Sequence, residues 1–302
     1  MEAATHSHSH AADSAFSRLR VIVGDYFEMT KPRVQLLLLW TTVTTMLVAG
    51  EPSLQLILLT CLGGALSAGG AGAINHYIDR DIDAQMARTA TRPVPSGRVA
   101  PEAALAYGIF LGAASMVVLL LGVNELAALL SLCGLLGYVF VYTLWLKRRT
   151  VQNIVIGGAA GAIPPLVGWA AVTGSLSLTA WLLFLIVFMW TPPHFWALSV
   201  LIRDDYAASS VPMLPVVRGI ESTTRHILVY SLLLVATTLI PVATGAFGAL
   251  YAAVAIVLGA MFVRKAIGLT KNAERSAALS TYLFSMVYLA LLFAAMVFDK
   301  WI

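Results

Sequence analysis

Nine apolar runs follow one another along this sequence, and each is long enough to cross a bilayer as a helix. A bilayer core of about 30 Å needs about 20 helical residues, whereas a strand of a membrane barrel needs only about 10. The composition agrees, because 59% of the 302 residues are hydrophobic and 11% are charged, against about 25% charged in a soluble domain. The sequence therefore predicts an all-α, polytopic membrane helix bundle with transmembrane spans at 34–50, 54–76, 101–121, 125–146, 151–173, 178–203, 225–244, 246–264 and 278–297.

The basic residues of the predicted loops give the orientation of the bundle. With a cytoplasmic N-terminus, 18 of the 19 lysines and arginines lie on the cytoplasmic side, as the orientation rule for short loops requires. The net charge of +4 therefore reflects topology and indicates no nucleic-acid partner. The first 33 residues mix acids with bases, unlike a signal or transit peptide. We expect a multi-pass protein of the bacterial cytoplasmic (inner) membrane, with the mitochondrial inner membrane as the alternative for a mature chain.

The chain divides at the start of the first span. We expect residues 1–29 to form a cytoplasmic tail that is disordered at its start, and residues 30–302 to form a single transmembrane domain. The HSHSH run at 6–10 has metal-binding residues, but a solvated tail is the preferred interpretation because nothing apolar is there to pack. Cys61 and Cys133 both fall inside predicted spans, so we expect small buried residues and no disulfide.

Two long charged segments occupy matching places in the predicted bundle. DRDIDAQMARTATRPVPSGR (79–98) follows the second span, and RDDYAASSVPMLPVVR (203–218) follows the sixth. Each runs from acids through a pair of prolines to an arginine, which suggests a weak 4+4 internal repeat with the ninth span as an appendage. Corresponding polar segments in two halves of a membrane protein indicate one site between them. We therefore expect both loops to meet at one cytoplasmic site.

Asn75, Asp79 and Asp83 are spaced four residues apart, so on a helix they share one face. Two carboxylates and an amide oxygen at a membrane boundary need a cation, and an all-oxygen set suits Mg²⁺. The alternative is an interfacial set of salt bridges with Arg80 and Arg88.

Basic residues accompany these acids in the cytoplasmic loops. Arginine forks match phosphate oxygens, so acids together with bases indicate a metal-bound diphosphate. The sequence has no GxxxxGK[ST] loop, and an apolar chamber beside such a site fits a prenyl diphosphate whose departing diphosphate is neutralised there. A transporter for an anionic lipid or metabolite is the alternative class, although the outward loops are short and nearly uncharged. The basic candidates are Lys31, Arg33, Arg88, Arg92, Arg98, Lys147 and Arg148.

Four blocks in the first two thirds of the chain carry a resemblance. They are TKPRVQL (30–36), NHYIDRDIDAQMARTATRPVPSGR (75–98), LKRRTVQNIVIGGAAGAIPPLVGW (146–169) and PPHFWALSVLIRDDYAASSVPMLPVVRG (192–219). The pattern NxxxDxxxD followed by RTxxRP resembles the UbiA-type intramembrane prenyltransferase superfamily. The fuller blocks resemble its protohaem IX farnesyltransferase (haem O synthase) group over residues 25–220, while the last three spans match in topology alone.

The resemblance implies a reaction and its residues. Farnesyl diphosphate would ionise with Mg²⁺, the farnesyl group would add to a vinyl group of haem B, and water would complete haem O. Haem A synthase or terminal-oxidase assembly would be downstream partners, and a relative with an aromatic or quinone-precursor acceptor is the alternative. The motif implies metal and catalytic roles for Asn75, Asp79 and Asp83. It also implies diphosphate-binding roles for Arg88, Arg92 and Lys147.

The second charged segment departs from the superfamily at large, which has a second pair of aspartates four residues apart. Asp205 is present as a catalytic and metal-binding candidate, but Leu201 stands four residues before it. The number of Mg²⁺ ions, one or two, stays open. His194 precedes Asp205 by eleven residues, which places it roughly 16 Å deeper on a regular helix. It is the candidate for binding haem, and a buried histidine bonded to a neighbouring helix is the alternative.

Overall fold

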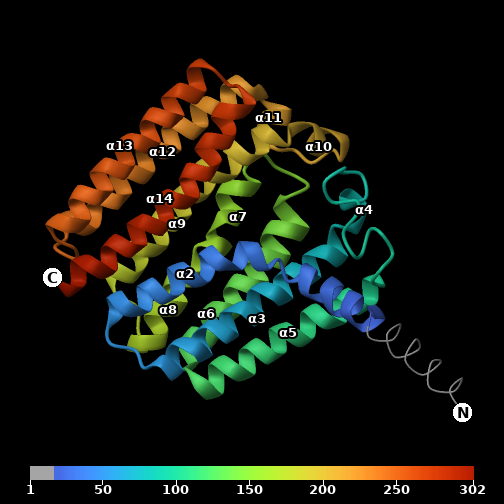
Figure 1. The fold of residues 1–302 in the computed structure, drawn as a ribbon, viewed down its shortest axis with the longest axis horizontal. Helices are drawn as coiled ribbons and strands as arrows, with labels where there is room; N and C mark the ends of the chain where they lie inside the picture. Colours follow the sequence, from blue (N-terminus) through green and yellow to red (C-terminus); the bar gives the residue numbers. More distant parts are fainter. Residues whose placement is uncertain (1–16) are drawn as a thin grey trace, which may run out of the picture.

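The computed structural model describes residues 17–302, and within that part of the chain it is helical, with no strand (Figure 1). Nine of its helices are long and apolar enough to cross a membrane, each overlapping one predicted span, so the polytopic bundle is confirmed. They are α2 (Pro32–Ala49), α3 (Leu54–Ile78), α5 (Pro101–Gly122), α6 (Glu125–Leu136) continued by the π-helix η1 (Gly137–Leu146), α7 (Asn153–Gly161) with α8 (Ile163–Thr173), α9 (Leu178–Leu201), α12 (Gly219–Ala243), α13 (Ala249–Lys271) and α14 (Arg275–Trp301).

Local chemistry explains where these helices begin and break. The side chains of Ser53, Asn124 and Ser177 cap α3, α6 and α9 by accepting a hydrogen bond from a backbone N–H of the first turn, as short polar residues do at this position. The fifth span divides at Ala162, two residues before the pair Pro164 and Pro165, which lack backbone donors. By contrast, α9 continues as one helix through its own pair of prolines.

Three short helices lie outside the spans, in the two charged segments. They are α4 (Arg80–Asp83), α10 (Arg203–Ala208) and α11 (Leu214–Val217). Before the first span, residues 17–29 are also helical, and Arg98 holds this segment through an ion pair of 2.8 Å to the buried Asp25. The HSHSH run lies outside the described residues, so its solvated character stays a prediction.

Small residues let the first helices pack closely. A Cβ built on Gly70 of α3 would lie 2.7 Å from the carbonyl oxygen of Gly108 on α5, closer than real Cβ atoms approach a backbone oxygen. The two helix backbones therefore touch, as small residues allow in membrane bundles. Cys61 is half-buried and Cys133 is exposed, and both are free, so the expected burial is wrong for Cys133.

The ninth span is part of the bundle rather than attached at its edge. Helix α14 packs on α9, α13 and α2, and Figure 1 shows it between the C-terminal helices and the N-terminal ones. The indole N–H of Trp190 on α9 donates to the carbonyl of Ser285 at 2.7 Å. The indole N–H of Trp40 on α2 donates to the carbonyl of Ala290 at 3.0 Å. Helix α14 thus joins the two halves of the molecule.

Candidate functional site

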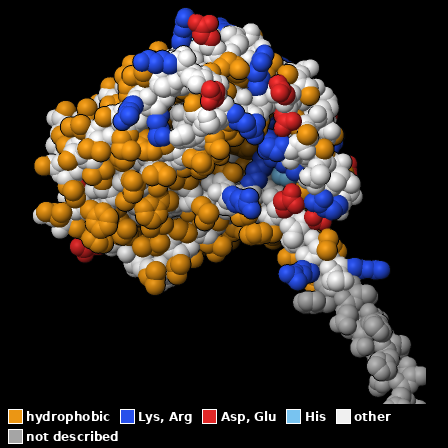
Figure 2. All heavy atoms as spheres, turned by 45° about the horizontal axis from the view of Figure 1, so that its top comes forward, with side chains coloured by type: hydrophobic (Ala, Val, Ile, Leu, Met, Phe, Trp, Pro, Cys, Tyr) orange, Lys and Arg blue, Asp and Glu red, His pale blue; other side chains and the backbone are white. Residues whose placement is uncertain are grey.

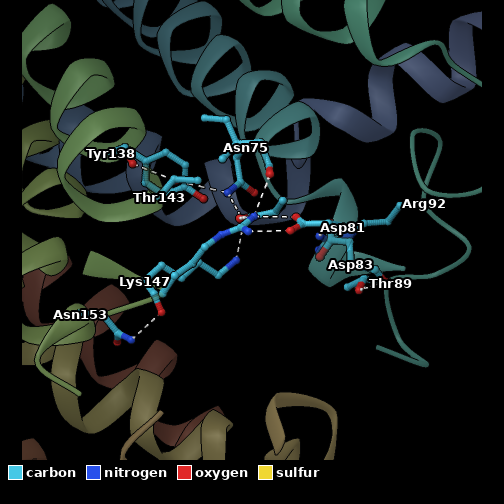
Figure 3. Close-up of polar contacts among 12 residues, drawn as sticks. Asn75, Asp81, Asp83, Thr89, Arg92, Tyr138, Thr143, Lys147 and Asn153 are labelled. Atoms are coloured by element: carbon cyan, nitrogen blue, oxygen red, sulfur yellow. Dashed lines mark hydrogen bonds and ion pairs between the residues drawn. The ribbon is translucent and has the colours of Figure 1, made fainter. Parts of the chain in front are cut away.

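The predicted acidic motif lies at the end of α3, where the chain turns into α4 (Figure 3). The helical hydrogen bonds continue through the break, from the N–H of Asp79 to the carbonyl of Asn75 (2.9 Å) and from the N–H of Asp83 to that of Asp79 (2.8 Å). All three residues are at most 3% exposed. They follow one another at successive turns, as the spacing predicts.

Asp79 is the most heavily contacted acid of the motif. Its carboxylate accepts from the Lys147 ammonium, from the Asn75 amide at 2.6 Å and from Arg148 at 3.5 Å. Arg148 also makes a bidentate ion pair with Asp81, with both hydrogen bonds at 2.6 Å. This guanidinium lowers the pKa of the Asp81 carboxyl. A fully buried carboxylate is costly unless it is paired, so the loop after η1 is what allows Asp79 to lie here.

Asp83 has one cationic partner. Arg92 donates to its carboxylate at 2.7 Å, and the hydroxyl of Thr89 donates to its backbone carbonyl at 2.9 Å. The alternative pairing with Arg80 or Arg88 is absent among residues 17–302, since Arg80 donates to the carbonyl of Tyr77 instead. The acids are therefore paired, but their partners are residues predicted to bind diphosphate and not Arg80 or Arg88.

Lys31 completes the cluster from the start of α2. Its backbone is left-handed (φ 56°), and its ammonium donates to Asn75 Oδ1 at 2.6 Å and to the Tyr138 hydroxyl at 3.4 Å. Burial of the ammonium, followed by the charges of Arg92 and Lys147, lowers the pKa of Lys31 to about 7. Arg33, in contrast, is exposed, and none of the described contacts links it to the cluster.

The second charged segment faces the first across a cleft of about 370 Å³. Asp205 is half-buried on α10. Tyr206 is the next residue on α10, and burial is the main cause that raises the pKa of its hydroxyl. The charges of Arg88, Arg92, Asp205 and Asp83, from both loops, also act on that pKa. Figure 2 shows lysines and arginines around a hollow beside a broad hydrophobic surface. The cleft is lined by Ala87, Arg88, Leu201, Ile202, Asp204, Asp205 and Arg275.

His194 lies deep in the bundle, away from the charged cluster. Its Nδ1 is 2.6 Å from the Ser285 hydroxyl on α14, and its ring stacks between Trp190 and Tyr282 at centroid distances of 4.2 and 4.9 Å. This is the arrangement of a buried histidine bonded to a neighbouring helix. A role in binding haem stays a prediction.

Four residues of the site have no distinctive signal in the sequence. Tyr138 and Thr143 stand in the apolar run of η1, and only their contacts with Lys31 and Asn75 reveal them. Asn153 and Tyr206 carry a weak signal, because each follows a predicted residue closely in a charged block. Asn153 donates to the carbonyl of Lys147 at 3.3 Å, while its own buried oxygen has no partner.

The donor set fits Mg²⁺ in kind but is small. Among residues 17–302 no group of three or more His, Cys, Asp or Glu residues could hold a metal ion. The buried cluster offers one amide oxygen and two carboxylates, from Asn75, Asp79 and Asp83. Mg²⁺ is commonly held by one or two carboxylates together with substrate phosphates, so a site of this size suits a metal that arrives with a diphosphate.

Comparison with known proteins shows which family this chain is similar to. The UbiA prenyltransferase family matches residues 38–295. The protoheme IX farnesyltransferase of Gloeobacter violaceus is 51% identical over 96% of this chain and 96% of that protein. The protoheme IX farnesyltransferase of Chloroflexus aurantiacus is 53% identical over 93% of this chain, which spans 48% of that protein's length.

Solved structures share the fold. The structure of a UbiA homologue from Archaeoglobus fulgidus, bound to DMAPP and Mg²⁺, superposes with a TM-score of 0.69 at 17% identity, covering 90% of this chain and 99% of that one. At that identity the likeness concerns the arrangement of helices. Together with the profile match and relatives at more than half identity, it shows that the chain belongs to the UbiA prenyltransferase family.

Proposed function

We propose that this protein transfers the farnesyl group of farnesyl diphosphate to a vinyl group of haem B, with Mg²⁺ and water, to give haem O and diphosphate. The observation that carries the proposal is a buried cluster of two carboxylates and an amide, ringed by Lys31, Arg92 and Lys147, at one end of an apolar bundle. Family membership and the names of the relatives support the reaction class and the acceptor.

The charged residues would handle the head group of the donor. Mg²⁺, when held by Asn75, Asp79 and Asp83, would neutralise the departing diphosphate. Asp205 lines the cleft on the second loop, and we propose that it joins these ligands only when metal and diphosphate are bound. Lys147 and Arg92 contact the acids Asp79 and Asp83, and Lys31 contacts the Asn75 amide oxygen. We propose that all three cations turn to phosphate oxygens when diphosphate binds. Arg88 and Arg148, at the rim, would complete the ring, while Arg33 is the weakest of the proposed ligands.

The bundle would handle the tail and the acceptor. The bond between farnesyl C1 and the diphosphate oxygen breaks, and C1 bonds to the outer vinyl carbon of haem B. Water then adds to the inner vinyl carbon and loses a proton. A dry apolar chamber protects the allylic cation from early capture by water. His194 is the candidate haem contact, and haem A synthase or oxidase assembly would receive the product.

We further propose that the N-terminus and both charged loops face the cytoplasm of a bacterial inner membrane. All but one of the lysines and arginines then lie on that side. Residues 30–302 would act as one transmembrane domain behind the N-terminal tail.

The test is a reaction of purified protein in detergent with haem B, farnesyl diphosphate and Mg²⁺, followed by mass spectrometry of the extracted haem. A Mg²⁺-dependent mass gain of one farnesyl plus one water is the expected result. Prenylation of an aromatic or quinone-precursor acceptor instead would keep the diphosphate site and reject haem. Recovery of intact farnesyl diphosphate with every acceptor would reject the enzyme and favour a transporter.

A further inference from the structure

The fourth span ends in a ten-residue π-helix, η1, which passes directly beside the acidic motif. The N–H of Lys147 bonds to the carbonyl of Tyr142, five residues back, at 2.8 Å. π-helical segments are rare and are frequent at functional sites. This one brings Thr143, whose side chain is fully buried, against Asn75.

The hydrogen bonds of Thr143 leave only one arrangement for the Asn75 amide. The Thr143 hydroxyl donates its single proton to the carbonyl of Tyr138 at 2.9 Å. Its oxygen therefore can only accept, and it accepts from Asn75 Nδ2 at 3.3 Å. The same Nδ2 donates to Asp79 Oδ2 at 2.6 Å, so Oδ1 is directed at the Lys31 ammonium, 2.6 Å away.

The opposite orientation of the amide is excluded by its neighbours. A flipped Asn75 would set its oxygen against the Asp79 carboxylate and its NH₂ group against the Lys31 ammonium. It would also leave the Thr143 oxygen without a donor. Buried polar groups that lose their hydrogen-bond partners in this way are costly, so the neighbours hold the amide in the orientation described.

We propose that Thr143 is a positioning residue of the metal site, which holds the Asn75 amide with its oxygen toward the cation. The cation that the Asn75 oxygen contacts is the Lys31 ammonium. That Mg²⁺ takes the place of Lys31 rests on the proposed function. Residues that orient a metal ligand in this way typically change metal affinity by about 10–100-fold when they are lost.

The test compares Thr143→Val, which removes the hydroxyl but keeps the shape, with Thr143→Ser, which keeps the hydroxyl. The measurement is calorimetric titration of Mg²⁺ into purified protein with inorganic pyrophosphate, which needs no turnover. Thr143→Val should weaken Mg²⁺ binding about tenfold or more, while Thr143→Ser should stay within about twofold of the wild type. Thr143→Ala provides the same comparison if the valine variant does not fold.

A matched control separates positioning from the loss of any buried hydroxyl. Thr45 is fully buried and its hydroxyl has no partner, so Thr45→Val should leave Mg²⁺ binding unchanged. Wild-type affinity in folded Thr143→Val, or equal losses in the serine and valine variants, would overturn the role of Thr143. Asp79→Asn tests the site itself: unchanged affinity there would reject the proposed metal site, and loss there without loss in Thr143→Val would reject only this inference.

Discussion

Two acids of the site have two roles, since Asp79 and Asp83, which would hold a metal, also hold a lysine or an arginine in place. Asp79 is the clearest case, because it is fully buried and contacts Lys147, Arg148 and Asn75. Removing one member of such a buried pair leaves the other uncompensated, at a cost of about 3–5 kcal/mol. Changes here are therefore expected to affect function and stability together.

Asp79→Asn should abolish farnesyl transfer, because the variant loses a carboxylate that would hold the metal and the partner of Lys147. The protein should still insert in the membrane, since the nine apolar helices are unchanged. Turnover and elution of detergent-solubilised protein as a single species check this. Full activity in both Asp79→Asn and Asp83→Asn would contradict the metal site.

Arg92→Ala should raise the KM for farnesyl diphosphate by about tenfold or more, because a charge-assisted hydrogen bond contributes about 1.5–3 kcal/mol. It should also lower the melting temperature, since it leaves the buried Asp83 without its cation. Arg80→Ala is the matched control on the same loop, because Arg80 lies over the Tyr77 ring and contacts none of the acids. An unchanged KM in Arg92→Ala would argue against its role.

The lowered pKa of Lys31, about 7, predicts proton uptake on binding. As pH rises above 7, a growing fraction of the free protein carries a neutral Lys31. An anionic diphosphate favours the charged form, so binding at such pH should take up a fraction of a proton that approaches one. Affinity for pyrophosphate should therefore fall as pH rises above 7, by up to about tenfold per unit. Calorimetry in buffers of different ionisation enthalpy measures the uptake. Lys31→Gln should remove it, whereas Arg33→Gln, at an exposed position, should not.

At the scale of elements, the N-terminal helical segment is tied to the first charged loop. Arg98 bonds to the buried Asp25, to Glu28 and to the carbonyl of Thr91, and Tyr26 packs edge-on against Tyr107 of α5 at 4.9 Å. The segment before the first span thus supports the loop that carries Asp83 and Arg92.

Asp25→Asn should loosen this attachment, because it removes the charge from an ion pair whose carboxylate is nearly buried and whose arginine is partly exposed. Such a pair contributes on the order of 1 kcal/mol. Limited proteolysis and amide exchange in residues 17–29 should both become faster. Glu221→Gln is the control: its ion pair with Arg225 is largely exposed, and exposed pairs contribute little. Equal rates of proteolysis and amide exchange in Asp25→Asn and the wild type would contradict the attachment of residues 17–29 to the first charged loop.

The spans were predictable because length and hydropathy decide them, and the spacing of Asn75, Asp79 and Asp83 predicted their shared side. The partners of these acids were not predictable. Lys147 approaches Asp79 from 68 residues away, and its direction depends on a π-helix that no local pattern in GYVFVYTLWL distinguishes from an α-helix. The integration of α14 was not predictable for a similar reason, because the indoles of Trp190 and Trp40 bond to its backbone carbonyls, which any apolar helix possesses.

At the scale of the whole molecule, metal and diphosphate should bind together. Lys31 and Lys147 donate to the side-chain oxygens of Asn75 and Asp79. Mg²⁺ alone must displace these two lysines, whereas diphosphate gives them another partner. Mg²⁺ affinity should rise at least about tenfold with pyrophosphate present, and by reciprocity pyrophosphate affinity should rise equally with Mg²⁺.

Lys147→Met removes one of the competing cations and should reduce this coupling while Mg²⁺ alone binds more tightly than to the wild type. Calorimetric titrations of each ligand, with and without the other, measure it. Independent binding of Mg²⁺ and pyrophosphate to the wild type would contradict the prediction.

The internal pairing of acids and bases also bears on how the protein is made. Acids and bases that neutralise one another cost less to place at the membrane boundary than the same groups unpaired. The cluster is therefore expected to ease membrane insertion and folding of the chain that carries it.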